Sequence, residues 1–480
     1  MVYRLNDGTT GSLDYREMAP AAAHRDMFLD SLGHHDSALS TVGGLSVGVP
    51  GTIKGIFAAH KKFGLLPIED LIDPVIALAE KGYVITDKQS ARLAQYREVI
   101  RETSGTESLY TKVISAGDTI KNIALAKTLK QLRDQGEQAF YGGAMAKHMS
   151  QFIQAKGGVI QMEDFQNYEV HWRDPIAFNY EDLEIISMGP PSSGGICLAQ
   201  IMGMLEPFDL KELGHNSALY AQHLTEAERR AYADRSHYLG DPDFVNIPTE
   251  QLLSPAYLAE KMTSFSTKTA TLSGAISHGN IVGHESDETT HYSIVDPMGN
   301  AVSVTTTING AYGSKLFDPE LGFFYNNEMD DFSAKPGSPN MFGLIGGEAN
   351  AIAPGKRMLS SMTPTIVLKK GQLWLVLGTP GGSTIITTVL QIILNTQHFN
   401  MGMQEAVNQP RMHHQWLPDV LQFEYDGFSE DLLDTLNQKG YKTLKKAHRI
   451  IGKVDAIMRH SDGLLEAGAD PRGDDAAQGF

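Results

Sequence analysis

Thr289 stands where a polar segment meets a run of β-branched residues, and this position is suited to nucleophilic chemistry. Residues 284–288 are His-Glu-Ser-Asp-Glu, and residues 290–295 continue as Thr-His-Tyr-Ser-Ile-Val. If the peptide bond between Glu288 and Thr289 is cut, the new α-amino group can serve as the base for the threonine's own hydroxyl. The ordinary alternative is structural, because threonine favours pleated surfaces. On these residues alone both interpretations stay open.

Gly381 and Gly382 form a second candidate site, between a strand-like run and a helical pattern. Residues 373–377 are predicted to be a strand, and a helix is expected from Ser383 onward. The N–H groups at the start of a helix and the positive end of its dipole can stabilise a developing oxyanion. A tight strand-to-helix turn without a chemical role explains the same residues.

Two predicted hairpins position these residues. Residues 289–295 and 301–309 are joined by an Asp-Pro-Met-Gly-Asn turn, which is typical of a hairpin. Residues 365–368 and 373–377 flank a Lys-Lys-Gly-Gln turn and form the second hairpin. Both candidate sites therefore lie at strand ends.

Helices are expected mainly before these hairpins. One is predicted to begin with Asp73 as its N-cap and Pro74 as its first residue, and to stop at Gly82. Its apolar face should contain Val75, Leu78 and Ala79. Other helices are expected from the N-cap Asn122 to near Gly136, from near Ile196, and over residues 216–233.

Several features that could suggest a cofactor have simpler explanations. The Gly-Pro-Pro-Ser-Ser-Gly-Gly loop at 189–195 lacks the Lys and the spacing of a phosphate-binding loop, so we interpret it as a buried turn. His413 and His414 point to opposite sides of a strand, and no third ligand is spaced nearby. Cys197 is interpreted as an inert core thiol. The prediction is no cofactor and no metal.

Composition excludes several classes of protein. The chain has 480 residues, 41% of them hydrophobic, and a formal charge of −17. This charge argues against binding to nucleic acid or to an anionic membrane surface. The sequence contains no apolar run near the roughly 18 residues of a membrane span. One cysteine allows no intrachain disulfide.

Four blocks of sequence resemble the γ-glutamyltransferase family of the N-terminal-nucleophile hydrolases. They occur in the order found in that family. The blocks are Thr-Thr-His-Tyr at 289–292, Asn-Asn-Glu-Met-Asp-Asp-Phe at 326–332, Ser-Ser-Met-Thr-Pro-Thr at 360–365 and Gly-Thr-Pro-Gly-Gly-Ser at 378–383.

The resemblance implies an α/β (α+β) fold, an αββα four-layer sandwich with two stacked antiparallel sheets between helical layers. Residues 1–288 would form the large subunit and residues 289–480 the small subunit. The two fragments of this precursor would stay together as a heterodimer with one core. Compared with the family, the chain begins inside the large subunit, after a Gly-rich segment, and its end matches the family's ending. Family members are generally periplasmic or secreted, although residues 1–7 are too polar for a signal peptide.

The resemblance also implies a mechanism. Thr289 would cut the chain before itself and then attack the γ-glutamyl amide of glutathione or a related compound. Gly381 and Gly382 would stabilise the oxyanion, and Thr307 would orient the nucleophile. Water would hydrolyse the γ-glutamyl-enzyme, or an amino acid or peptide would accept the group.

Substrate recognition is carried over in the same way. Arg25, Ser360 and Ser361 would bind the α-carboxylate of the glutamyl group. Asn309, Glu328 and Asp331 would bind its α-ammonium. Residues 335–344 resemble a loop that covers the substrate in some members, with Phe342 at the position of a lid aromatic.

Two alternatives remain. One is a glutaryl-type β-lactam acylase of the same superfamily, against which Glu328 and Asp331 argue, since a glutaryl group has no ammonium. The other is an unprocessed, inactive protein that binds γ-glutamyl compounds.

Overall fold

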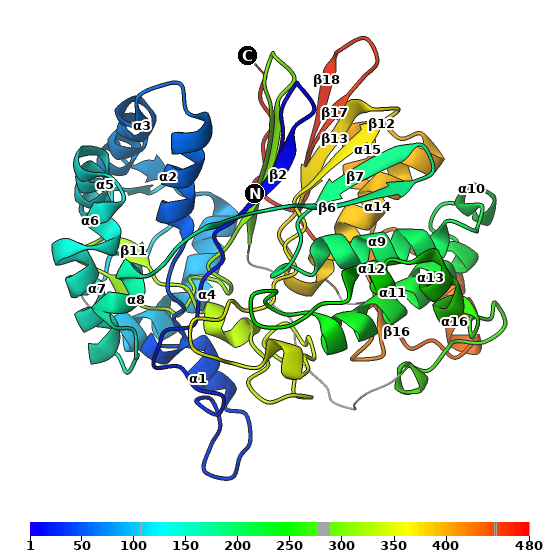
Figure 1. The fold of residues 1–480 in the computed structure, drawn as a ribbon, viewed down its shortest axis with the longest axis horizontal. Coiled ribbons are helices and arrows are strands. Elements are labelled where there is room, and N and C mark those ends of the chain that lie inside the picture. Colours follow the sequence, from blue (N-terminus) through cyan, green and yellow to red (C-terminus); the bar gives the residue numbers. More distant parts are fainter. Residues whose placement is uncertain (106–107, 277–288, 446, 448, 480) are drawn as a thin grey trace.

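Two antiparallel sheets packed face to face form the centre of the computed structural model (Figure 1). The structure describes residues 1–105, 108–276, 289–445, 447 and 449–479. The first sheet has the order β5-β2-β1-β9-β8 and the second the order β18-β17-β13-β12-β7-β6. The strands of the first sheet are β1 (Val2–Arg4), β2 (Thr10–Asp14), β5 (His171–Arg173), β8 (Thr290–Val295) and β9 (Ala301–Thr306). Those of the second are β6 (Ile176–Tyr180), β7 (Leu183–Ser187), β12 (Thr365–Lys369), β13 (Gln372–Gly378), β17 (Asp455–Arg459) and β18 (Leu465–Ala469).

The two predicted hairpins are confirmed, and each lies in a different sheet. β8 pairs with β9 and β12 pairs with β13, in both cases antiparallel. Val2 and Ala301 of the first sheet pack against Ile366 and Val376 of the second. The hydroxyl of Ser303 donates to a backbone carbonyl of β13 across this interface, at 2.9 Å. Apolar packing and cross-sheet hydrogen bonds therefore fix one sheet against the other.

Both sheets contain strands from before and after the predicted cut. β1, β2, β5, β6 and β7 precede residue 288, and the other strands of the two sheets follow Thr289. Two fragments produced by such a cut would remain joined by backbone hydrogen bonds in both sheets.

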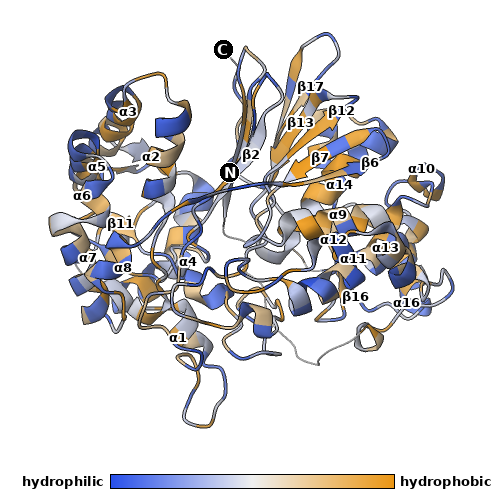
Figure 2. Ribbon diagram, in the orientation of Figure 1, coloured by the Kyte–Doolittle hydropathy of each residue, from blue (hydrophilic) through white to orange (hydrophobic). Residues whose placement is uncertain are grey.

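Helices α9 (Gly194–Leu205), α11 (Ala218–Tyr238) and α14 (Ile385–Phe399) accompany the second sheet. Figure 2 shows that β7, β12 and β13 are largely hydrophobic, as is α14 beside them. Val367 and Leu375 of the sheet belong to the same buried cluster as Ile196 and Ile393 of the helices. The helices predicted near Ile196 and over 216–233 are confirmed, with α11 extending to Tyr238.

A second group of helices lies on the other side of the sheets (Figure 1). α2 contacts the first sheet, where Phe63 packs on Tyr3 with ring centroids 4.8 Å apart. The architecture is thus α+β, with two stacked antiparallel sheets between helices, as predicted. The group comprises α1 (Ser37–Thr41), α2 (Thr52–Phe63), α3 (Ile68–Lys81), α4 (Asp87–Ser104), α5 (Ile123–Gln135), α6 (Gln138–Tyr141), α7 (Gly143–Ala155) and α8 (Met162–Gln166).

Shorter elements complete the described part of the chain. The helices are α10 (Leu210–Leu213), α12 (Thr249–Leu252), α13 (Pro255–Met262), α15 (Met403–Asn408) and α16 (Glu430–Gln438). The strands are β3 (Tyr83–Val84), β4 (Thr119–Ile120), β10 (Phe317–Asp318), β11 (Phe323–Phe324), β14 (Met412–His413), β15 (Leu421–Phe423) and β16 (Thr443–Lys445). Six 3₁₀ turns are η1 (Gly44–Ser46), η2 (Leu109–Thr111), η3 (Ser273–Ala275), η4 (Glu328–Asp331), η5 (Glu348–Asn350) and η6 (Gly382–Thr384).

Helix α3 begins earlier than predicted. It starts at Ile68, so that Asp73 is not its N-cap and Pro74 lies inside it. Its buried face agrees with the prediction only in part: Ala79 packs against α5 as predicted, together with Ile76, whereas Val75 and Leu78 are about half exposed. Packing on α5 sustains the helix through the proline, which local sequence signals alone would place at a helix start.

Helix α5 follows the sequence prediction closely. Asn122 is its N-cap, and the side-chain oxygen accepts a hydrogen bond from Leu125 N at 3.0 Å. The helix ends before Gly136, as expected.

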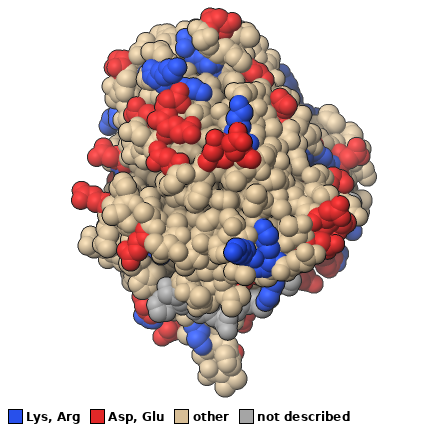
Figure 3. Space-filling model, turned by 90° about the vertical axis from the view of Figure 1, so that its right-hand side faces the viewer, with Lys and Arg blue, Asp and Glu red and all other residues tan. Residues whose placement is uncertain are grey.

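On the face of the molecule shown in Figure 3, Lys and Arg side chains lie among Asp and Glu and form no continuous basic surface. Within the described ranges, no helix combines the length and the apolarity that a membrane crossing requires.

Candidate active site

The first hairpin brings Thr289 and Thr307 together. Thr290 of β8 is paired with Thr306 of β9 in an antiparallel arrangement, so Thr289, just before β8, faces Thr307, just after β9. The hydroxyl of Thr289 donates to Oγ1 of Thr307 at 3.3 Å, and Oγ1 of Thr307 also accepts from the backbone N–H of Asn309 at 2.8 Å. The other residue of the predicted cut, Glu288, lies outside the described residues.

A cavity of about 20 Å³ adjoins Thr289. Seven predicted site residues line it: Thr289, Thr307, Asn309, Asp331, Ser360, Ser361 and Gly382. The lid aromatic Phe342 also lines it, together with two arginines that the sequence analysis did not assign, Arg16 and Arg235.

Arg16 carries the positive charge next to Asp331. Its guanidinium forms ion pairs with Glu328, at 2.5 Å, and with Asp331. Burial lowers the pKa of Arg16, but Glu328 and Asp331 more than compensate, so the group stays charged. Burial raises the pKa of Glu328 and of Asp331, and Arg16 offsets part of each rise. Two guanidinium groups, those of Arg16 and Arg235, and the carboxyl group of Asp331 thus line the cavity, an arrangement that a zwitterionic ligand can match.

Arg25 does not lie at this cavity, and the prediction for it is corrected. Its side chain is 52% exposed and pairs with Glu348 at 2.5 Å. The chain leaves β2 through Arg16, and a series of turns after Pro20 then carries Arg25 to the surface. Arg16 lies two residues after the end of β2, so its side chain remains close to the sheet.

Glu328 is fully buried and contacts Arg16 without lining the cavity. The structure thus places it behind the arginine, whereas Asp331 reaches the cavity itself. Gly381 likewise precedes the lining residue Gly382 and is not part of the wall.

Arg235 lies inside α11 and holds Ser361 directly and Ser360 through Ser193. Its Nε donates to Ser193 Oγ at 2.9 Å, and its Nη2 donates to Ser361 Oγ at 3.1 Å. Ser193 Oγ in turn donates to the backbone carbonyl of Ser360 at 2.7 Å. The Gly- and Ser-rich loop at 189–195 is buried, as predicted, and it also fixes the position of Ser360 and Ser361.

Gly381 and Gly382 form a tight turn between β13 and α14. Their φ angles are +142° and +55°, a region that favours glycine. A 3₁₀ turn from Gly382 to Thr384 precedes α14, so the helical geometry begins one residue before the predicted Ser383. A Cβ atom on Gly382 would lie 2.5 Å from Cδ1 of Phe342.

The predicted lid loop, residues 335–344, covers this turn. Phe342 is only 4% exposed. Met341 N donates to Asp330 Oδ2 at 2.8 Å, and Asn340 Nδ2 donates to Asp331 Oδ1 at 3.3 Å. The loop is therefore attached to the segment that carries Asp331.

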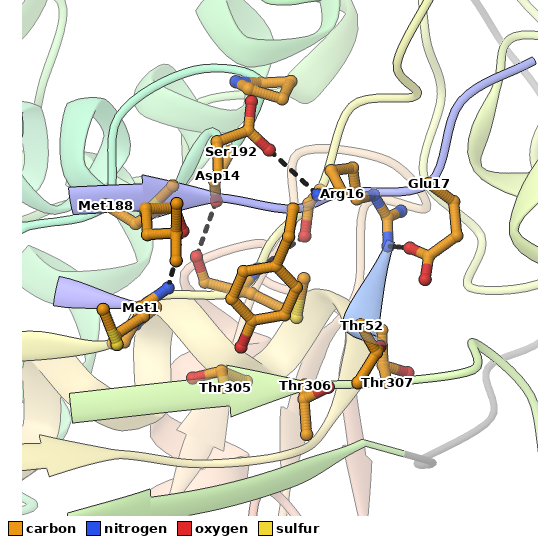
Figure 4. Close-up of a pocket in the computed structure, with 16 residues that line it drawn as sticks. Met1, Asp14, Arg16, Glu17, Thr52, Met188, Ser192, Thr305, Thr306 and Thr307 are labelled. Atoms are coloured by element: carbon orange, nitrogen blue, oxygen red, sulfur yellow. Dashed lines mark hydrogen bonds and ion pairs between the residues drawn. The ribbon is translucent and has the colours of Figure 1, made fainter. Parts of the chain in front are cut away.

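A second cavity, of about 40 Å³, lies on the other side of Arg16 and Thr307 (Figure 4). Arg16 and Thr307 line both cavities, and Asp14 and Glu17 line only the second. Burial raises the pKa of Glu17 to about 7. Acidic groups thus surround Arg16 from both sides.

His413, His414 and Cys197, the residue types that often bind metal ions, are buried among protein groups. Burial lowers the pKa of His413 to about 3 and of His414 to about 4, and both rings bond to protein groups. Burial raises the pKa of Cys197 to about 12. Across the described residues no group of three or more potential ligands is placed to hold a metal ion.

A threonine directly before strand β8, in two stacked antiparallel sheets between helices, is the arrangement of the N-terminal-nucleophile hydrolases. Residues 1–480 match the gamma-glutamyltranspeptidase family, and the chain belongs to this family of enzymes.

Individual relatives agree with this assignment. The chain is 45% identical over 486 residues to the glutathione hydrolase proenzyme of Escherichia coli K12, covering 100% of this chain and 83% of the relative. It is similar to the Helicobacter pylori gamma-glutamyltranspeptidase structure at 40% identity and a TM-score of 0.55, covering 56% of this chain and 79% of that one. The cephalosporin acylase structure from Bacillus halodurans has a TM-score of 0.84 at 22% identity, over 98% and 85% of the two chains, and shares the fold.

Proposed function

We propose that this protein is a self-processing γ-glutamyltransferase that hydrolyses glutathione and related γ-glutamyl compounds or transfers their γ-glutamyl group. The observation that carries this proposal is the pair of hydroxyls on Thr289 and Thr307, which lie 3.3 Å apart in a chain of this family. They adjoin a cavity that is lined by both positively and negatively charged side chains. We also propose that the protein works outside the cytoplasm, as the family resemblance suggests, which cell fractionation tests.

Processing uses the same hydroxyl as catalysis. Thr289 Oγ attacks the carbonyl carbon of Glu288, the peptide C–N bond breaks, and the released nitrogen takes the proton. Water then hydrolyses the ester and leaves Thr289 with a free α-amine. Such an amine has an ordinary pKa of about 7.7–8.0, which suits a base near neutral pH. The fragments 1–288 and 289–480 stay associated through the shared sheets.

Turnover repeats this chemistry on the substrate. The α-amine removes the proton of Thr289 Oγ as the oxygen attacks the γ-carbonyl carbon, and backbone N–H groups of Gly381 and Gly382 stabilise the oxyanion. The amide C–N bond breaks and the leaving amine takes the proton. Water or the amine of an amino acid or peptide then attacks the γ-glutamyl ester. Thr307 fixes the direction of the Thr289 hydroxyl.

Recognition of the glutamyl head follows from the charges that line the cavity. We assign the α-carboxylate to Arg16, Ser360 and Ser361, with Arg16 in the place expected for Arg25. The α-ammonium is assigned to Asp331 and Asn309. Glu328 does not line the cavity, and its role is to hold the guanidinium of Arg16 in place through their ion pair.

A comparison of two chromogenic amides tests the acyl specificity. The γ-glutamyl and glutaryl p-nitroanilides differ only in the α-amino group. We expect clear preference for the γ-glutamyl anilide, because a glutaryl group offers no ammonium to Asp331. Thr289→Ala should release no p-nitroaniline from either substrate. Preference for the glutaryl anilide would support the acylase alternative, and a protein that binds but never turns over would support the inactive one.

A further inference from the structure

Gln415 uses all of its hydrogen-bonding capacity in the segment that follows β14. The residue is 2% exposed. Its Oε1 accepts from Ser383 Oγ at 2.7 Å and from His413 Nε2 at 2.9 Å. Its amide nitrogen donates to the backbone carbonyls of Phe342 and Leu417, both at 3.3 Å. Because carbonyl oxygens can only accept, these partners fix which end of the amide is nitrogen.

Two of the four partners of Gln415, Ser383 and Phe342, belong to the oxyanion turn and to the lid, which both line the cavity. Ser383 directly follows Gly382, the candidate oxyanion donor. Phe342 is the lid aromatic, and its ring lies so close to Gly382 that an added Cβ would be 2.5 Å from Cδ1. The Gln415 side chain therefore connects the backbone of the lid to the side chain beside the oxyanion turn.

We propose that Gln415 is a positioning residue that latches the lid loop over the oxyanion turn during turnover. The inference rests on the proposed function, since it takes Gly382 as an oxyanion donor and Phe342 as the lid aromatic. Phe342 lines the cavity and is only 4% exposed, so in this proposal the lid opens to admit a glutamyl group and closes again behind it. The latch then limits the access of water to the γ-glutamyl-enzyme.

The chemistry of the latch requires an amide at this position. A carboxylate could accept from Ser383 but could not donate to the Phe342 carbonyl, and an apolar side chain could do neither. Among the four groups bonded to Gln415, only His413 titrates. Burial lowers its pKa to about 3, so it remains a neutral donor at working pH. The one bond to the lid, from Gln415 to the Phe342 carbonyl, is long at 3.3 Å, which suits a contact that must open in each cycle.

The first experiment compares Gln415→Met with Gln391→Met by hydrogen exchange of residues 335–344. Gln391 is an equally buried glutamine that bonds to Thr387 O and to the backbone of Met412, next to the same segment. We expect lid exchange about 2- to 10-fold faster in Gln415→Met, the range for one lost hydrogen bond, and unchanged lid exchange in Gln391→Met. The ratio of hydrolysis to transfer should rise in Gln415→Met alone. Equal lid exchange in both variants and the wild type would overturn the proposal.

The second experiment uses Gln415→Glu, which keeps the shape of the side chain. At acidic pH the protonated acid can accept from Ser383 and donate to the lid carbonyl; once ionised, it can only accept. Lid exchange corrected for intrinsic rates should match the wild type at low pH and exceed it as pH rises. If the difference in lid exchange between Gln415→Glu and the wild type does not change with pH, the latch is refuted. This test does not depend on whether Gln415→Met folds. An uncut, inactive wild type would instead refute the proposed function.

Discussion

Replacing Arg16 and Arg25 one at a time tests which arginine serves the glutamyl carboxylate. Arg16→Lys keeps a positive charge among buried carboxyl groups, but it loses the planar guanidinium whose two terminal nitrogens pair with Glu328 and Asp331. A lost hydrogen bond to a charged group costs about 1.5–3 kcal/mol, which corresponds to roughly 10- to 150-fold in kcat/KM. Arg25→Gln breaks an exposed pair with Glu348, which contributes little to stability and nothing to the cavity.

The assay is the hydrolysis of γ-glutamyl p-nitroanilide by fully processed protein, with thermal melting to separate stability from binding. We expect the loss in Arg16→Lys to appear mainly in KM, and kcat/KM of Arg25→Gln to stay within about twofold of the wild type. The reasoning would be refuted by the opposite pattern, a large loss in Arg25→Gln with Arg16→Lys near the wild type.

Three further substitutions probe the turn, the buried acids and the nucleophile. Gly382→Ala places a Cβ against Phe342 and should lower kcat by about 10²-fold. The control is Gly371→Ala, where φ is +75° and the space around an added Cβ is open, and this variant should retain activity. Equal losses of activity in the two variants would point to backbone strain alone. Burial raises the pKa of Glu17 from 4.5 to about 7, so the folded protein keeps a proton that the unfolded chain releases, and wild-type stability falls as pH rises from 4.5 to 7. The melting temperature of Glu17→Gln minus that of the wild type should therefore increase as pH rises over this range. A difference that stays constant with pH would contradict the raised pKa of Glu17. Thr307→Val removes the acceptor of the Thr289 hydroxyl and should slow both self-cleavage and turnover by about 10- to 100-fold in timed gels and anilide assays; wild-type rates would exclude a role in orientation.

The sequence predicts the two central hairpins because their turns and β-branched runs are local signals. The register of the first hairpin then places Thr289 opposite Thr307 without further information. Asn122 and Gly136 bound α5 as predicted for the same reason, since capping depends on neighbouring residues.

The features that sequence reasoning missed depend on the path of the chain. Arg16 and Arg25 both stand beside an acid in the sequence, and only the turns after Pro20 decide which of them stays at the sheet. Arg235 reaches Ser361 because α11 packs against α9 beside the second sheet, a contact between distant segments. The start of α3 differs because packing against α5 outweighs the local preference of Pro74.

The most direct test of the central claim is an intact-mass spectrum of freshly purified protein, with N-terminal sequencing of the smaller fragment. The chain of 52.4 kDa should yield fragments of about 31 and 21 kDa, in proportion to their lengths, and the smaller one should begin at Thr289. Thr289→Ala should remain a single chain. An uncut wild type after incubation near neutral pH, or a fragment that begins elsewhere, would contradict the assignment of Thr289 as the nucleophile.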